Sequence, residues 1–213
     1  MMPLISMQKV ERLLCIGAHC DDIEIGAGGT IMRLIAQNPD IHIRWVILTG
    51  ADPIRAAEAR QAAALFTQGA TQVQVDILGF KDGYLPWQGE QLKSAFEILK
   101  QDFVPDLIFT HYAQDKHQDH RCAAELTWNT WRNHAILEYE ILKWDGDLGQ
   151  PNTFVPLDES LSQGKVEQIY TTFVTQQTRS WFEKETFLAL MRIRGVECNA
   201  QYAEAFYARK IIW

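Results

Sequence analysis

The stretch LLCIGAHCDDIEIGAGGTI, residues 13–31, predicts how the chain begins to fold. Its first part, Leu13–Ala18, is an apolar run that ends in small residues, which is typical of a buried strand. Its last part predicts a helix that is opened by Gly28 and Gly29 and runs to about Gln37. A polar group, residues 19–22, lies between them. Buried carboxylates are costly unless they are paired or bound to a metal, so this group predicts a functional site rather than core packing.

The rest of the chain alternates between strand patterns and helix patterns. Alternation with helices of about 10–15 residues predicts right-handed βαβ units and an α/β fold with a mostly parallel sheet. No linker or repeat interrupts it, so we expect one domain over residues 1–213. The expected strands are 42–49, 73–78, 107–111, 138–143 and 208–213, the expected helices are 56–66, 92–102, 121–132, 165–176 and 184–194, and residues 144–156 are expected to form a turn-rich loop.

Two polar clusters follow two of the expected strands. His19 and its neighbours follow the strand 13–18, and the cluster 115–120 follows the strand 107–111. Ligands of parallel α/β sheets bind at the carboxyl ends of the strands, so both clusters are expected on one rim. A catalytic zinc ion takes three nitrogen or oxygen ligands and keeps one position open for water. His19 and Asp22, at i and i+3, can supply two ligands and His120 the third, while Asp21 can accept the proton of a water molecule that zinc acidifies.

Three separated motifs resemble those of the PIG-L/LmbE-like deacetylases. HCDDIEIGAGGT, residues 19–30, resembles the AHPDDxExGxGGT signature of that family, and HQDH, residues 117–120, resembles its HxDH motif. RG at 194–195 followed by YAEAF at 202–206 resembles its C-terminal ending. The resemblance covers nearly the whole chain. It implies a Rossmann-like three-layer sandwich and hydrolysis of an N-acetyl group on a glucosamine-type substrate.

The resemblance also implies roles for six residues of the two clusters. His19, Asp22 and His120 become the metal ligands, and Asp21 becomes the general base. His117 polarises the tetrahedral intermediate or protonates the leaving amine, and Asp115 holds His117 in its charged or correct tautomeric form. The expected cofactor is Zn²⁺, and a His/Asp site also accepts other divalent metals. Cys20 stands where the family usually has proline, which frees the turn and adds one N–H donor.

Two interpretations stay open for several other residues. The resemblance implies that Arg55 and Glu58 lie near the sugar, but the start of a solvated helix with an i, i+3 pair also explains them. His111 ends a strand and points either into the site or into the core. The glycine run lacks the GxGxxG spacing of dinucleotide sites, and close packing of the helix explains it better.

The last third of the chain carries two further expectations. Residues 143–152 combine Trp144 with several hydrogen-bonding groups, which makes them a candidate contact with substrate or with a second subunit. Arg194 and Glu204 are expected to pair and to hold the C-terminal segment in place.

Composition limits the partners. A net charge of −7 disfavours the nucleic-acid backbone as a partner. Four cysteines without a CxxC pair indicate reduced thiols and a cytoplasmic protein. Residues 1–10 show no signal peptide, and no apolar run approaches the ~18 residues of a transmembrane segment. The expected partner is therefore a small-molecule N-acetylated amino sugar, and the sequence leaves a homo-oligomer open.

Two other functions fit the same residues. One is a zinc amidohydrolase that acts on a small, non-sugar acyl amine. The other is a Rossmann-like nucleotide-binding protein without hydrolytic activity. Metal analysis separates the nucleotide-binding protein from the enzymes, and acetate release from N-acetylglucosamine derivatives separates the two enzymes.

Overall fold

The computed structural model describes residues 10–211, whose strands form one mixed sheet. The strands are β1 (Arg12–Gly17), β2 (His42–Ile47), β3 (Gln72–Ile77), β4 (Leu107–His111), β5 (Ala135–Tyr139), β6 (Thr153–Leu157) and β7 (Tyr202–Tyr207). Their order in the sheet is β3-β2-β1-β4-β5-β7-β6. The first five are parallel, and β7 runs antiparallel to both β5 and β6. The predicted mostly parallel sheet is thus confirmed. The expectation of no signal peptide concerns residues 1–10, of which 1–9 lie outside the described range.

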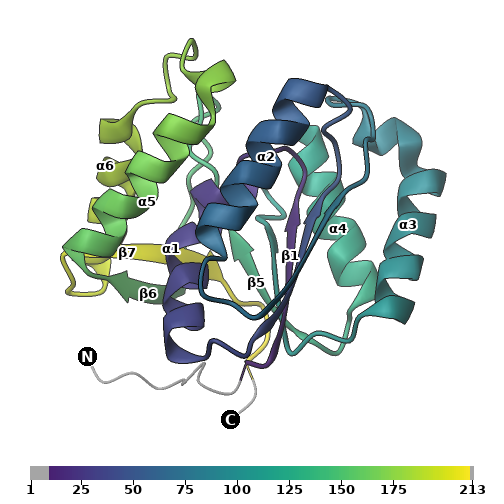
Figure 1. Ribbon diagram of the computed structural model, residues 1–213, viewed down its shortest axis with the longest axis horizontal. Helices are drawn as coiled ribbons and strands as arrows, with labels where there is room; N and C mark the ends of the chain where they lie inside the picture. The colour runs from purple at the N-terminus through teal and green to yellow at the C-terminus, as the bar shows by residue number, and fades with distance from the viewer. Residues whose placement is uncertain (1–9, 212–213) are drawn as a thin grey trace.

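Helices cover both faces of the sheet (Figure 1). They are α1 (Asp22–Gln37), α2 (Pro53–Phe66), α3 (Gly89–Asp102), α4 (Gln118–Thr130), α5 (Glu159–Thr172) and α6 (Lys184–Glu197), with short 3₁₀ turns η1 (Leu85–Gln88) and η2 (Val174–Gln176). Successive β1 side chains point to opposite faces. Leu13 and Cys15 join the core under α1, α2, α5 and α6, whereas Leu14 and Ile16 join the core under α3 and α4. This arrangement confirms the three-layer sandwich.

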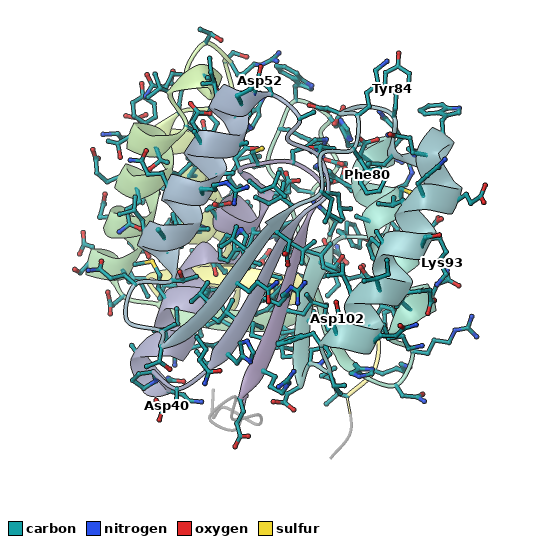
Figure 2. The ribbon with its side chains drawn as sticks, turned by 45° about the vertical axis from the view of Figure 1, so that its right-hand side comes forward. Asp40, Asp52, Phe80, Tyr84, Lys93 and Asp102 are labelled. Atoms are coloured by element: carbon teal, nitrogen blue, oxygen red, sulfur yellow. The ribbon has the colours of Figure 1, made fainter. Side chains whose placement is uncertain are left out.

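The order of the strands reverses next to β1. From β1 the chain moves outward to β2 and β3, and then returns to place β4 on the other side of β1. In open α/β sheets, ligands bind at such a reversal, beyond the carboxyl ends of the two central strands. In Figure 2, Asp52 and Tyr84, which follow β2 and β3, mark the carboxyl end of the sheet. Asp40 and Asp102, which precede β2 and β4, lie toward the other end. Both polar clusters lie at this reversal, because one follows β1 and the other follows β4.

The first helix begins earlier than the sequence predicts. α1 starts at Asp22, so the glycine run lies inside the helix and does not open it. Each glycine costs about 1 kcal/mol relative to alanine in a helix, which the packing outweighs. A Cβ atom at Gly26 would lie 2.2 Å from the Tyr139 ring, and one at Gly28 would lie 2.5 Å from Phe66. The interpretation of the run as close packing is therefore confirmed.

The C-terminal third differs most from the prediction. β5 ends at Tyr139, the predicted loop 144–156 contains all of β6 but its last residue, and the last strand is Tyr202–Tyr207 rather than 208–213. Residues 208–211 form no strand, and 212–213 lie outside the described range. The strand YAEAFY has a glutamate, Glu204, in its middle, which is unfavourable in a buried strand unless its charge is paired. Its partner, Lys165, is remote in sequence, so the local pattern does not indicate a strand here. Within residues 10–211 no helix is long and apolar enough to cross a membrane.

The predicted Arg194–Glu204 pair is wrong. Arg194 donates to Glu140 through Nε at 2.6 Å and Nη2 at 2.8 Å. Glu204 pairs with buried Lys165 at 2.6 Å and accepts the Gly29 backbone N–H at 2.8 Å. Although β7 packs mainly against α6, which carries Arg194, the Glu204 side chain faces α1 and Lys165 of α5, and Arg194 reaches Glu140 instead. These two ion pairs join the antiparallel end of the sheet to the rest of the fold.

Candidate active site

Local turns set the direction of the site residues at both central strands. The His19 backbone N–H donates to Asp22 Oδ2 at 2.6 Å, which closes the turn between β1 and α1. The His117 backbone N–H donates to Asp115 Oδ1 at 2.7 Å, which closes the turn before α4. Short polar side chains that bind nearby backbone N–H groups favour such turns over continued strand. The two turns thus bring their polar side chains together at the carboxyl end of the sheet.

The three predicted metal ligands converge. His19 Nδ1 lies 3.1 Å from His120 Nε2 and 3.3 Å from Asp22 Oδ2, and His120 Nε2 lies 3.5 Å from Asp22 Oδ1. His19 and His120 are 101 positions apart in the chain, so only the fold brings them together. Burial lowers the pKa of each histidine, but the Asp22 charge and the neighbouring carboxylates outweigh it and raise both pKa values. The site therefore favours positive charge.

Asp115 orients His120 rather than the ring of His117. Its Oδ2 lies 2.9 Å from His120 Nδ1, and its Oδ1 lies 3.0 Å from Lys143 Nζ. Burial opposes ionisation of Asp115, but the His120 hydrogen bond and the Lys143 charge outweigh it and hold its pKa far below the usual range. The expected contact with the His117 side chain is absent from the hydrogen bonds of the described chain, because the His117 ring caps α4 instead.

The cap fixes the tautomer of His117. Its Nδ1 accepts the Asp119 backbone N–H at 3.2 Å. Burial and the charges of His120 and His19 lower the His117 pKa, so the neutral ring is favoured. A neutral imidazole whose Nδ1 accepts carries its proton on Nε2. His117 therefore presents an N–H donor, and its ring lies 4.8 Å from that of His19.

His111 supports the site from the core. Its Nε2 accepts the Ala18 backbone N–H at 2.9 Å and lies 3.1 Å from Asp22 Oδ2. Burial lowers the His111 pKa to about 4, so the ring stays neutral. It stacks on the His120 ring with centroids 3.9 Å apart. Of the two interpretations, the structure favours the buried, supporting histidine.

Arg55 links the predicted base to α2 and η2. Its Nη2 donates to Asp21 Oδ1 at 3.0 Å, and its Nη1 donates to Glu58 Oε2 at 2.9 Å. Glu58 also accepts from the Thr175 backbone N–H at 2.9 Å and from its hydroxyl at 2.6 Å. Burial raises the pKa of Asp21, and the Arg55 charge opposes this. Both Glu58 oxygens are engaged within the protein, so Glu58 positions Arg55; its contact with substrate stays a prediction.

The sequence interpretation missed one carboxylate beside His19, Asp82, and gave a second, Asp119, no role of its own. His19 Nε2 lies 3.3 Å from Asp82 Oδ1 and 3.4 Å from Asp119 Oδ2. Asp119 is held by the backbone N–H groups of Gly83, at 2.7 Å, and Leu85, at 3.1 Å. Asp82 follows β3 at the same end of the sheet, so the carboxyl-end rule that identified the two clusters could also have identified it.

Donor groups that are close enough to hold a metal overlap at His19 and His120. The groups of three are His19, His117 and His120; Asp22, His111 and His120; and His19, Asp82 and Asp119. Cys20 is not among them. Burial raises the pKa of its thiol to about 12, and a thiol binds metals as the thiolate.

Known proteins are similar to this chain in sequence and in fold. Residues 14–131 match the family described as PIG-L: GlcNAc-PI de-N-acetylase. The uncharacterized deacetylase YaiS of Escherichia coli (strain K12) is 34% identical over 147 residues, which are 64% of this chain and 77% of that protein.

Two solved structures show the same fold. The N,N'-diacetylchitobiose deacetylase from Pyrococcus horikoshii has a TM-score of 0.75 and 22% identity, over 94% of this chain and 84% of its own. GalB, the 4-carboxy-2-hydroxymuconate hydratase from Pseudomonas putida KT2440, has a TM-score of 0.77 and 17% identity, over 95% of this chain and 98% of its own. A deacetylase and a hydratase share the architecture, so the reaction must be argued from the site.

Proposed function

Because the chain belongs to the PIG-L family of de-N-acetylases, we propose that it is a metal-dependent hydrolase that removes the N-acetyl group from an amino sugar. The family, described as GlcNAc-PI de-N-acetylase, supports an amino-sugar substrate, and the deacetylase relative supports the reaction. The four free thiols of the chain support a cytoplasmic location.

One observation carries the proposal: the donor atoms of His19, Asp22 and His120 lie 3.1 to 3.5 Å apart. Zinc bonds of about 2.0–2.2 Å in tetrahedral geometry place ligand atoms roughly 3.3–3.6 Å apart, so the donor set fits. The same carboxylates that raise the two histidine pKa values favour a divalent cation. Asp115 orients the His120 ring through its other nitrogen, as ligating histidines require. When bound, the metal supplies a Lewis acid that polarises the amide and acidifies water.

The chain's own residues move the protons and hold the charge. Asp21, whose Oδ1 is held by Arg55, accepts a proton from the attacking water as the oxygen–carbon bond forms. The His117 Nε2–H donates to the acyl oxygen as it gains negative charge. Asp21 then returns its proton to the nitrogen as the carbon–nitrogen bond breaks, which releases acetate and the free amine. The His117 tautomer favours this assignment over proton donation to the amine.

Aspartate variants test the proposal. The protein is purified without added metal, its metal content is measured, and acetate release from N-acetylglucosamine and its β-1,4-linked oligomers is followed. Asp22→Ala is expected to lose both metal and activity. Asp21→Asn is expected to keep the metal and to lose activity by about 10²–10⁴-fold. Asp40→Asn, at the opposite end of the sheet in Figure 2, serves as the control and is expected to change neither.

Each alternative has its own result. If Asp22→Ala binds metal as the wild type does, the ligand set is wrong. Acetate release from simple acyl amines but from no sugar selects the non-sugar amidohydrolase. A nucleotide-binding protein is disfavoured because Tyr139, Phe66 and Leu157 occupy the space around the glycine run.

A further inference from the structure

An exposed tryptophan packs against a second tryptophan near the candidate site. Trp144, in the connection from β5 to β6, is 63% exposed. Its ring lies 6.3 Å from Trp181 in a T-shaped arrangement, and the Arg179 guanidinium lies 5.7 Å from its centroid. Trp181 packs edge-on against Phe182 at 5.5 Å, and Phe182 is fully buried. We call Trp144, Trp181 and Arg179 the aromatic platform.

Hydrogen bonds and ion pairs tie both segments of the platform to the site. Lys143, next to Trp144, lies 3.0 Å from Asp115, which in turn lies 2.9 Å from His120. Lys143 also binds Asp147 at 2.8 Å, and Asp147 accepts the Lys116 backbone N–H at 2.7 Å. The Trp144 backbone is therefore anchored to the segment that carries His120.

The second segment is anchored to the proposed base. Thr175, which precedes Arg179 and Trp181, binds Glu58 through its backbone and its hydroxyl. Glu58 holds Arg55, and Arg55 holds Asp21. The segment that carries Trp144 is therefore connected to His120, and the segment that carries Trp181 is connected to Asp21.

The platform has the chemistry of a sugar-binding surface. Exposed tryptophan rings are costly in water and gain by stacking. Three exposed sequence neighbours of the platform carry polar side chains: Asp145 on one segment, and Thr178 and Ser180 on the other. A pyranose ring has apolar C–H faces and a polar edge, so it fits a lone aromatic ring that is surrounded by hydrogen-bonding groups. A wholly apolar group would leave those polar neighbours without partners.

We propose that Trp144 stacks on a sugar ring next to the acetylated one, so that the substrate is an oligosaccharide rather than a free monosaccharide. This inference rests on the proposed function, because it takes the reacting sugar to lie at the His19–Asp22–His120 cluster. It gives residues 143–152 a role in binding substrate, one of the two roles that the sequence leaves open.

Kinetics with sugars of increasing length test the inference. kcat/KM is measured on N-acetylglucosamine and its β-1,4-linked di- and trisaccharides for the wild type, Trp144→Ala, Trp144→Phe and Val104→Ala. Val104 is an equally exposed apolar residue that precedes β4, at the opposite end of the sheet. The wild type is expected to prefer the trisaccharide. Trp144→Ala is expected to lower the trisaccharide-to-monosaccharide ratio about tenfold, roughly 1.4 kcal/mol. Trp144→Phe keeps a stacking ring and restores most of the ratio, and Val104→Ala leaves it at the wild-type value.

Three results would overturn the inference: a wild-type ratio near one, an unchanged ratio in Trp144→Ala, or a preference for alkyl glycosides over the trisaccharide. Binding of glucosamine oligosaccharides, which carry no acetyl group, provides a test that needs no turnover. Tryptophan fluorescence is expected to report a Kd that weakens about tenfold in Trp144→Ala. If no sugar releases acetate but these oligosaccharides still bind through Trp144, the proposed reaction fails and the sugar surface stands.

Discussion

Replacing Gly26 by alanine tests whether the glycine run exists for packing. The added Cβ would lie 2.2, 2.5 and 2.9 Å from three ring carbons of Tyr139, where carbon atoms prefer separations of about 3.5–4.0 Å. The ring is fully buried, and its hydroxyl donates to the Ile16 carbonyl oxygen at 2.7 Å. It therefore cannot retreat without losing that hydrogen bond.

The expected effect on stability follows from these contacts. Overpacking costs about 1–3 kcal/mol, and a buried carbonyl left without its partner costs about 1–3 kcal/mol more. Better helix propensity returns about 1 kcal/mol. We expect a net loss of about 3 kcal/mol in the free energy of unfolding. A domain of this size loses roughly 2–4 °C per kcal/mol, so Tm should fall by about 6–12 °C.

Thermal and urea unfolding, followed by circular dichroism at a fixed metal concentration, measure the effect. Gly164→Ala is the matched control, because Gly164 lies within α5 and a Cβ there meets nothing within 4 Å. It should stabilise the protein by about 0.5–1 kcal/mol. If Gly26→Ala is as stable as the wild type, the collision with Tyr139 does not govern this position. A variant that is stable but defective in binding a nucleotide would instead support a phosphate-binding role for the run.

Three further predictions concern charge and metal. Glu204→Gln leaves Lys165 charged and buried without a counter-ion, so urea unfolding should show a loss of about 3–5 kcal/mol. Glu167→Gln, which breaks an exposed pair, should cost less than about 1 kcal/mol, and equal losses would contradict the argument. Arg55→Lys removes the planar fork that holds Asp21, so kcat should fall on the order of 100-fold with metal content unchanged; normal turnover would mean that Arg55 does not position the base. Removing the metal with a chelator should lower the free energy of unfolding by about 2.7 kcal/mol, measured against protein held at a hundred times the metal Kd; equal stability with and without metal would refute a site formed by the native fold.

The sequence by itself was sufficient for the α/β class and for predicting that the two polar clusters meet at one end of the sheet. Both follow from local patterns: apolar strands alternate with helices, and polar clusters come directly after two strands. Three motifs in order identified the family, which the comparisons bear out. Strand β7 was misplaced because its central glutamate looks unfavourable until its remote partner, Lys165, is known.

Only the tertiary structure decided which charged groups meet. Arg194 binds Glu140 and not Glu204, and Asp115 orients His120 and not the His117 ring. The energy of an ion pair or hydrogen bond depends on distances of a few ångströms between residues that are remote in sequence. A local pattern states which groups are available. Their partners are set when the strands, ordered by long-range pairing, bring the loops at one end of the sheet together.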